Sequence, residues 1–246
     1  MISQPFFFPW IGLLEQLRLA DIFVHYDDVQ YSKGGFMNRV QIKTPGGTKW
    51  LTVMLDNVKL GQNINQVKVN ITHNWRQSHY DFLKQNYQHA PYVEDMLEIV
   101  RKVYWQLKFD NLADLVINSV EELARYFGLE KDTAFCRSSD LGIPGKSTQR
   151  VLDIVKYFGA TDYITGMGAL KYFDFDLFER NHVAVNFINY KKVPYKQMHG
   201  MFTPFVSSLD LIANEGKNGL SYICSDSMYW RDFIKTESAI KYLDRA

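Results

Sequence analysis

The sequence predicts an α/β protein with a Rossmann-like, mainly parallel sheet, an antiparallel β insert near residues 40–71 and a helical region near residues 74–128. A strand–helix–strand pattern opens the chain, and strands alternate with helices again after residue 133. Such alternation is typical of parallel strands joined by right-handed crossovers. A length of 246 residues is compatible with one large domain or two small ones, and we expect a single α/β domain over residues 1–246.

The opening strand–helix–strand unit brings two strand ends together. A short apolar strand at residues 1–3 leads into a turn, and apolar residues then recur from Trp10 to Leu17 at the spacing of one helix face. The apolar run at residues 22–26 is typical of a buried strand and ends on two carboxylates, Asp27 and Asp28. Because ligands collect beyond the carboxyl ends of parallel strands, we expect the main pocket there. The polar side chains within reach are Gln4, Asp27, Asp28, Gln30, Tyr31, Asn38, Arg39 and Lys43.

The middle of the chain changes its periodicity once. The predicted antiparallel insert contains three short strands, near residues 40–42, 50–55 and 66–71. From Asn74 onward, apolar residues recur at helical spacing. Pro91 separates the first of these helices from the second, and the third is expected to end at Gly128.

After residue 133 the pattern returns to alternating strands and helices. The predicted strands lie at residues 134–136, 162–165 and 183–188. A helix is expected after each of the first two strands, over residues 147–158 and 174–180. Ser208 or Asp210 is expected to cap a further short helix that stops before Gly216. Beyond Ser221 the sequence predicts only aromatic packing.

Composition and charge exclude several classes of protein. The formal net charge is +1, so no global field favours DNA or an anionic membrane. Aromatic residues make up 15% of the chain, and many of them suit stacking on flat rings as well as core packing. We find no run of about 18 apolar residues and no basic-then-apolar leader, and we therefore expect a cytoplasmic protein that does not associate with membranes. Cys136 and Cys224 lack the spacing of a metal site and are interpreted as buried free thiols.

The stretch GIPGKST, residues 142–148, resembles a phosphate-binding loop between a strand and a helix. A true P-loop requires a glycine where this chain has Asp140, so that motif is absent. A helix start with free N–H groups and the side chains of Lys146 and Thr148 can still bind one phosphate. An ordinary helix cap is the competing interpretation.

Asp27 and Asp28 are interpreted as ligand-binding carboxylates. One of them is placed to accept hydrogen bonds from a ribose or sugar hydroxyl, with Gln30, Asn38 and Arg39 nearby. The alternative is that one carboxylate caps local N–H groups while the other is solvated. We expect no metal site, because adjacent strand residues point to opposite faces of a sheet.

His79 is the candidate general base. Transfer of an acyl group to an amine needs a base whose pKa is near neutral, which histidine supplies. His79 lies on the apolar face of its predicted helix, one turn after Trp75, where a hydrogen-bonded core histidine is the alternative. No GxSxG elbow is present and neither cysteine has a nucleophile setting, so covalent catalysis is not favoured.

A series of motifs runs along most of the chain. They include QPFFFPWIG, the IFV strand that leads into DDVQY, and KWLTV within the first 55 residues, followed by WRQSH, YQHAPY, FGATDYITG and FTPF. These motifs resemble the WbqC-like proteins of bacterial surface-polysaccharide gene clusters. The resemblance implies a cytoplasmic enzyme of O-antigen, lipopolysaccharide or capsule synthesis that transfers glycine or another aminoacyl group to an amino sugar.

The leading hypothesis is acyl or aminoacyl transfer to the amino group of a nucleotide-linked amino sugar. In it, His79 or Asp27 takes the amine proton, while Asn38 or Arg39 and backbone N–H groups stabilise the oxyanion. The donor stays open among aminoacyl-tRNA, a carrier-protein thioester, a coenzyme A thioester and an ATP-activated amino acid. A homo-oligomer is compatible with the sequence. The residues expected to bind substrate are Gln4, Trp10, Asp28, Gln30, Tyr31, Asn38, Arg39, Lys43, Ser138, Ser139, Lys146, Thr148, Gly166 and Tyr172.

Two other classes of function stay open. The first strand, turn and helix are similar to those of ATP-dependent nucleotidyl transferases and ligases, although the turn lacks their HIGH-type histidines. A non-catalytic sugar-binding module is the third hypothesis, since a tyrosine-rich surface is sufficient for it. Pyrophosphate release from ATP separates the second class from the first, and a change in the mass of the sugar nucleotide separates the first from the third.

Overall fold

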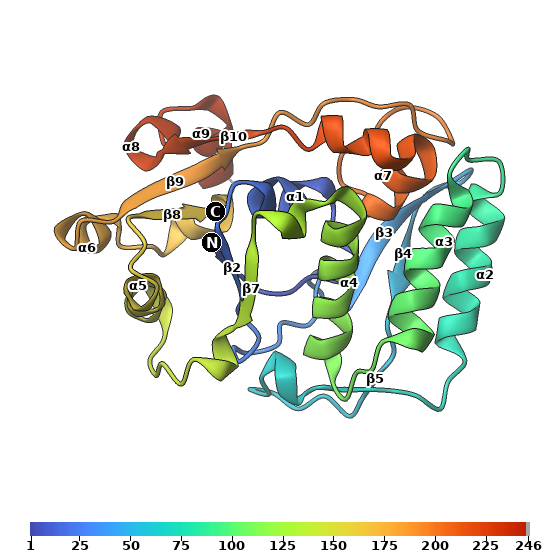
Figure 1. Ribbon diagram of the computed structural model, residues 1–246, viewed down its shortest axis with the longest axis horizontal. Coiled ribbons are helices and arrows are strands. Elements are labelled where there is room, and N and C mark those ends of the chain that lie inside the picture. The colour runs from blue at the N-terminus through green and yellow to red at the C-terminus, as the bar shows by residue number, and fades with distance from the viewer. Residues whose placement is uncertain (245–246) are drawn as a thin grey trace.

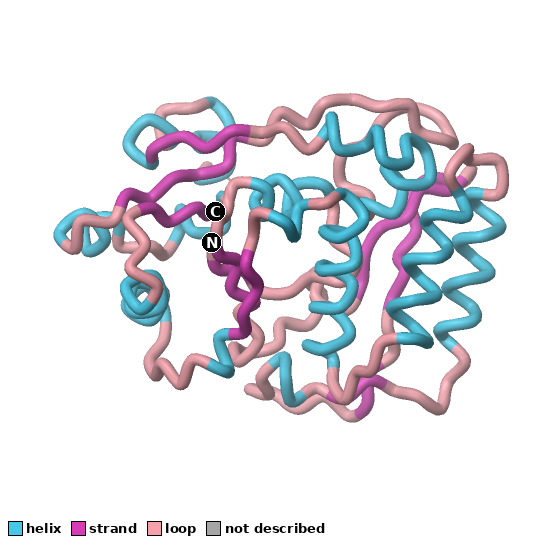
Figure 2. Tube along the Cα trace, in the orientation of Figure 1, coloured by secondary structure: helices cyan, strands magenta, loops and turns pink. Residues whose placement is uncertain are grey.

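The computed structural model describes residues 1–244 and confirms the predicted mixed α/β class. Two small sheets with parallel strands lie in the middle and on one side of the molecule, and the helices of the middle region lie on the other side (Figures 1 and 2). Both ends of the described chain lie near the centre of this view, close to the place where the two sheets meet (Figure 1).

The first sheet is parallel and has the strand order β1-β2-β7. Its strands are β1 (Ile2–Ser3), β2 (Ile22–His25) and β7 (Ala134–Arg137). Helix α1 (Ile11–Arg18) connects β1 to β2 and buries Leu13, Leu14 and Leu17 on the face that the spacing of apolar residues indicated. The predicted strand–helix–strand unit is therefore confirmed.

The second sheet has the order β10-β9-β8, with β8 and β9 parallel and β10 antiparallel to β9. Its strands are β8 (Asp162–Thr165), β9 (Ala184–Asn189) and β10 (Asp226–Tyr229). The helices around it are α5 (Ser147–Tyr157), α6 (Phe175–Arg180), α8 (Trp230–Phe233) and α9 (Glu237–Leu243). Phe187 stacks on Phe233 with ring centroids 4.8 Å apart, so the stretch beyond Ser221 does contribute aromatic packing and also supplies β10.

The parallel strands do not form one continuous Rossmann-like sheet in the part of the chain that is described. Edge strand β1 lies against edge strand β8, but the two belong to separate hydrogen-bonded ladders. The short β1 ends at Ser3, and Pro5, which has no N–H to donate, follows soon after. The chain turns away at that point, and the space between the two sheets is left open on the side of the strand ends.

The predicted antiparallel insert is confirmed in outline. Its elements are β3 (Arg39–Thr44), β4 (Gly47–Thr52), β5 (Leu55–Asp56), the 3-10 turn η1 (Ile64–Gln66) and β6 (Lys68–Val69). β3 and β4 form a hairpin, and β6 pairs with β5. The third strand is shorter than predicted because η1, closed by a capping box between Asn63 and Gln66, occupies its first residue.

The helical region is also confirmed. Its helices are α2 (Trp75–Tyr87), α3 (Val93–Arg101) with the π-helical turn η2 (Lys102–Gln106), and α4 (Leu112–Phe127). α4 ends at Gly128, whose φ of 75° is left-handed as the predicted glycine cap requires. Helix α7 (Ser208–Glu215) joins this region, and its cap is Ser207 rather than Ser208 or Asp210, because the Ser207 hydroxyl accepts the Leu209 N–H.

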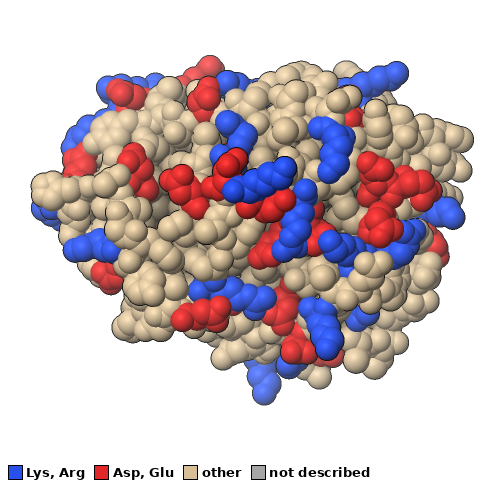
Figure 3. Space-filling model, in the orientation of Figure 1, with Lys and Arg blue, Asp and Glu red and all other residues tan. Residues whose placement is uncertain are grey.

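Residues 190–206 form a long segment without strands or α-helices between β9 and α7. On the face shown in Figure 3, lysines and arginines are interspersed with acidic residues, as expected from the small net charge. Within residues 1–244, no helix has the length and apolar character needed to span a membrane. The short 3-10 segments η3 (Leu129–Lys131), η4 (Ser138–Asp140), η5 (Met167–Lys171) and η6 (Gly216–Tyr222) complete the fold.

Candidate functional site

A cavity of about 1010 Å³ lies where the two sheets meet. Ser3 and Gln4 line it from the end of β1, Tyr26 from the end of β2, Gly166 from the end of β8 and Tyr190 from the end of β9. All of these residues lie at or just after the carboxyl ends of parallel strands, where α/β sheets bind their ligands. The cavity has the size of a site for a cofactor or a nucleotide.

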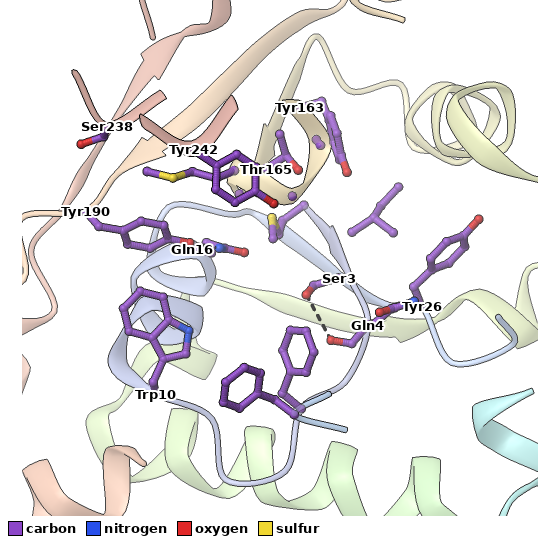
Figure 4. Close-up of a pocket in the computed structure, with 18 of the residues that line it drawn as sticks. Ser3, Gln4, Trp10, Gln16, Tyr26, Tyr163, Thr165, Tyr190, Ser238 and Tyr242 are labelled. Carbon is purple, nitrogen blue, oxygen red and sulfur yellow. Dashed lines mark hydrogen bonds between the residues drawn. The ribbon is translucent and has the colours of Figure 1, made fainter. Parts of the chain in front are cut away.

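One side of the cavity is aromatic. The ring of Trp10 lies 5.0 Å from that of Tyr190 and 5.7 Å from that of Phe205, measured between centroids. We call these three side chains the aromatic platform. Figure 4 shows Trp10 and Tyr190 on the side of the cavity opposite Tyr26. The Gln16 amide, on α1, donates to the Tyr190 hydroxyl and so fixes the Tyr190 ring.

The charged side chains in the lining are cationic. Lys192 and Lys241 reach the cavity, and none of its described lining residues is an aspartate, glutamate or histidine. The Lys192 Nζ lies 5.1 Å from the ring centroid of Phe205, whereas Lys241 pairs with the exposed carboxylate of Glu237 outside the cavity. This distribution favours an anionic ligand.

Behind Tyr26 lies a network of polar groups, in which Asp27, Ser138 and Arg150 are buried and Asp28 is partly buried. The Arg150 guanidinium lies 5.0 Å from the ring centroid of Tyr26 and donates from Nη2 to the Asp28 Oδ2 at 2.5 Å. The Ser138 hydroxyl donates to Asp28 at 2.5 Å and lies 3.2 Å from Asp27. Burial opposes the charged form of Asp28, but the hydrogen bonds from Arg150 and Ser138 outweigh it, and the pKa of Asp28 is lowered. Burial raises the pKa of Tyr26, with Arg150 opposing the shift, so the phenol keeps its proton and can donate it.

The sequence-predicted site residues fall into three places. Those that line the cavity are Gln4, Trp10, Gly166 and Tyr172. Asp27, Asp28, Ser138 and Ser139 form the network behind Tyr26, in which the Ser139 N–H and hydroxyl donate to the two Asp27 oxygens at 3.1 and 2.8 Å. Thr148 lies beneath Tyr172, where its hydroxyl oxygen accepts the Asp174 N–H at 3.2 Å, and Lys146 is an exposed N-cap residue of α5 whose side chain makes no capping bond.

The remaining predicted binding residues lie outside the cavity lining. The Tyr31 hydroxyl donates to Asn38 at 2.9 Å, and Asn38 donates to the Val53 carbonyl. Arg39 lies over the Trp50 ring at 4.2 Å. Gln30 is exposed and forms a β-bridge with Asn63, while the Lys43 Nζ donates to the carbonyls of Gly200 and Met201.

His79 lies in the core of the helical region and does not line the cavity. Its Nδ1 is 3.0 Å from the Tyr104 hydroxyl, and its ring packs against Trp75 and Phe7. Only 9% of His79 is exposed, and burial lowers its pKa to about 4. The imidazole is therefore neutral at physiological pH. Its role as a base is not tested by this placement and stays a prediction.

Several lining residues were not singled out from the sequence. Tyr26 ends the predicted strand 22–26 and Tyr190 lies two residues after the predicted strand 183–188, and that position was a usable signal. Lys192 and Phe205 lie in the segment 190–206, which has no periodicity, and Lys241 lies beyond Ser221, where the sequence predicted no element. Gln16 lies on the buried face of α1, where a core position is the ordinary expectation. Among residues 1–244, no group of three or more His, Cys, Asp or Glu side chains is arranged to hold a metal ion.

The fold and the cavity together define a mixed α/β protein with a site suited to a small anionic ligand. The model of the WbqC-like protein family matches residues 4–222, so the chain belongs to this family and the resemblance seen in the motifs is confirmed. The chain is 30% identical over 224 residues to the uncharacterized protein Rv1507c of Mycobacterium tuberculosis (strain ATCC 25618 / H37Rv), an alignment that covers 90% of this chain and 96% of that protein. No solved structure gives a significant match.

Proposed function

We propose that this protein is an acyl- or aminoacyl-transferase that modifies the amino group of a nucleotide-linked amino sugar in the cytoplasmic stage of surface-polysaccharide biosynthesis. The observation that carries the proposal is the cavity of about 1010 Å³, which contains two lysines and no carboxylate in its described lining. A nucleotide-linked sugar is an anion of suitable size for such a site. The pathway and the class of reaction in this proposal are those that the WbqC-like resemblance implies.

The position of the cavity supports the same ligand class. In Rossmann-like folds the ligand binds where the strand order reverses, outside the carboxyl ends of the strands. Here β1 and β8 are neighbouring edge strands. The strand that follows each of them in sequence, β2 or β9, lies on the side away from the other sheet, so the strand order reverses between β1 and β8. We interpret the divided sheet as a Rossmann-like arrangement that opens at this reversal to admit the ligand.

The lining residues suit acyl transfer to a neutral amine. Nearby cations disfavour the protonated form of a bound amino group, so the nucleophilic amine is populated without a carboxylate base. Its nitrogen forms a bond to the acyl carbon, the carbon–oxygen or carbon–sulfur bond of the donor breaks, and the amine proton passes to the leaving group. In this proposal Tyr26, protonated and backed by Arg150, donates a hydrogen bond to the oxyanion. Asp27 and Asp28 position Arg150 and Ser138 rather than touch the substrate.

Mass spectrometry tests the proposal directly. The purified chain is incubated with UDP- and TDP-linked amino sugars and, in turn, with glycyl-tRNA, an acyl carrier-protein thioester, a coenzyme A thioester, and glycine with ATP. One donor is expected to raise the mass of the sugar nucleotide by one acyl group, and Tyr26→Phe is expected to slow this product's formation by roughly 100-fold, as for the loss of an oxyanion donor. No product with any donor overturns the proposal.

The lining also favours a second candidate, a non-catalytic binding module, because it has no histidine or carboxylate among its described residues. Recovery of a tightly bound but unmodified sugar nucleotide in every donor reaction would support this candidate. Release of pyrophosphate without an acylated product would instead support an ATP-dependent nucleotidyl transferase or ligase.

A further inference from the structure

We propose that the aromatic platform of Trp10, Tyr190 and Phe205 is a stacking subsite for the nucleobase of a nucleoside diphosphate, and that Gly12 and Gly166 are the residues that position it. The inference deepens the proposed function and rests on it for the nucleotide nature of the ligand. The three rings come from the start of α1, the end of β9 and the segment before α7, so tertiary structure alone brings them together.

The platform is accessible to a flat ring. Phe205 is 50% exposed, and Trp10 and Tyr190 are half-buried at the cavity wall. Trp10 is tilted by 48° to Tyr190 and by 46° to Phe205, so the three rings are not stacked face to face on one another. Aromatic side chains of this kind stack on nucleobases with little preference for one base over another, because every base has a π-face.

Gly12 holds the Trp10 ring in place. A Cβ at Gly12 would lie 2.1 Å from Trp10 Cζ2, well inside any normal contact, so the indole rests directly on the glycine backbone of α1. The backbone of Trp10 is fixed by a β-bridge to Ser207, and the neighbouring Ser208 N–H donates to the Pro9 carbonyl at 2.8 Å. The indole can therefore occupy this position only while residue 12 has no Cβ, and the bridge holds the backbone from which the indole projects.

Gly166 supports the second ring in the same way. A Cβ there would lie 3.0 Å from Gln16 Nε2 and 3.4 Å from the Tyr190 hydroxyl. Gln16 in turn donates to that hydroxyl. A side chain at position 166 would therefore push on the pair that fixes Tyr190.

The cation beside the platform favours a nucleotide over a neutral sugar ring. Lys192, 5.1 Å from the Phe205 ring centroid, places a cation beside the platform, where the phosphates of a stacked nucleotide would lie. A nucleobase followed by a diphosphate thus matches both the rings and the charge.

Calorimetric titration of the full chain with UDP, TDP, CDP, ADP, GDP, inorganic pyrophosphate and a free amino sugar tests the inference. We expect at least one nucleoside diphosphate to bind more tightly than pyrophosphate. Trp10→Ala should weaken binding of that nucleotide by roughly 5- to 150-fold, the range for the loss of one base–aromatic stack. It should leave pyrophosphate binding unchanged. Trp10→Phe retains a ring and should retain most of the affinity.

Gly12→Ala should act like Trp10→Ala, because it displaces the indole without removing it. Its matched control is Gly46→Ala, since Gly46 lies in an exposed turn with no atom within 4 Å of the added Cβ. If Gly12→Ala does not fold, the comparison of Trp10→Ala with Trp10→Phe still shows whether an aromatic ring at position 10 is needed for nucleotide binding.

Three outcomes overturn the inference: no nucleoside diphosphate binds better than pyrophosphate, Trp10→Ala weakens both equally, or a free amino sugar is the ligand that depends on Trp10. These failures are distinct from failure of the proposed function. If an acylated product forms but nucleotide affinity is unchanged by Trp10→Ala, only the inference is overturned. Nucleotide binding that depends on Trp10, with no acylated product, overturns the transferase proposal alone.

Discussion

The Arg150 guanidinium donates to the Asp28 carboxylate at 2.5 Å and joins α5 to the end of β2 behind the cavity wall. Arg150 has only 7% of its side chain exposed, and its Nε also donates to the Ile143 carbonyl at 2.9 Å. The two partners are separated by 122 residues. The pair therefore ties the strand end that carries Tyr26 to the helix that precedes β8.

Loss of this ion pair should destabilise the fold. Arg150→Met leaves the partly buried Asp28 carboxylate without its cation, and we expect unfolding in urea to require about 1–3 kcal/mol less free energy. The matched control is Lys235→Met, since the Lys235–Asp232 pair is 71% and 65% exposed and should contribute less than about 1 kcal/mol. Equal effects of the two substitutions would show that Asp28 is compensated by Ser138 alone.

The Asp28 pair also predicts an acid limit of stability. The pKa of Asp28 is lowered in the folded state from 3.8, so its contribution is complete above that value and is lost as the pH falls through the lower folded pKa. Asp28→Asn, which cannot ionise, should flatten this part of the curve of unfolding free energy against pH. Acid unfolding that is unchanged by Asp28→Asn would contradict the assignment.

The lowered pKa of His79 predicts a second pH dependence of the free energy of unfolding, at higher pH than that of Asp28. Burial lowers its pKa from 6.5 to about 4, so the unfolded chain binds this proton more readily than the folded chain between these values. The stabilisation is complete above pH 6.5 and is lost as the pH falls toward 4, by at most about 3 kcal/mol.

The test of His79 is His79→Gln, measured for stability and activity together. The variant should lose the pH dependence between 6.5 and 4 and have a lower free energy of unfolding at pH 7, while each folded molecule stays active. Tyr104→Phe is the matched control, because it removes the hydroxyl 3.0 Å from Nδ1 but no group that titrates between pH 4 and 6.5. A stable, inactive His79→Gln protein that still binds ligand would support His79 as the base.

Local sequence patterns predicted the helices and strands better than they predicted the tertiary contacts between them. The spacing of apolar residues located α1 and the helical region, and Gly128 marked the end of α4, because these features depend on neighbours in the chain. The same patterns marked Asp27 and Asp28 as a strand end. They did not show that these carboxylates face Ser138 and Arg150, which lie more than 100 residues away and take up their hydrogen bonds.

The cavity itself was only partly predictable, for a related reason. Gln4, Trp10 and Gly166 follow or precede regular elements, and position alone indicated them. Lys192 and Phe205 occupy a segment whose path is set by tertiary contacts rather than by periodicity. The division of the parallel strands into two sheets depends on how short β1 is, and the length of an element is among the least certain features of a sequence pattern.

The segment 190–206 should loosen when its buried anchor is removed. The Tyr195 hydroxyl donates to the fully buried Asp210 carboxylate at 2.7 Å, and Tyr87 donates to the other oxygen at 2.7 Å. Tyr195→Phe orphans one of these oxygens, at a cost of about 1–3 kcal/mol.

Hydrogen exchange checks this expectation. Amides in residues 190–206 should exchange faster in Tyr195→Phe, and nucleotide affinity should fall, because Lys192 and Phe205 lie on that segment. Tyr157→Phe is the control, since Tyr157 is 63% exposed. Exchange that is faster over the whole chain, rather than in this segment, would contradict a local anchor.

The cavity lysines and Lys146 make opposite predictions about where a diphosphate binds. Lys192→Met removes the cation beside the aromatic platform and should weaken binding of nucleoside diphosphates by roughly tenfold, as for loss of a charged hydrogen bond. Lys241→Met should have a smaller effect, because Lys241 already pairs with Glu237. Lys146 does not line the cavity, so Lys146→Met should leave the affinity for nucleoside diphosphates unchanged.

Titrations at low and high salt complete the test. The affinity of the parent protein should fall as the salt concentration rises, and that of Lys192→Met should fall less. If Lys146→Met weakens binding while Lys192→Met does not, the phosphate site is the start of α5, as the GIPGKST stretch suggested, and the cavity binds another part of the ligand.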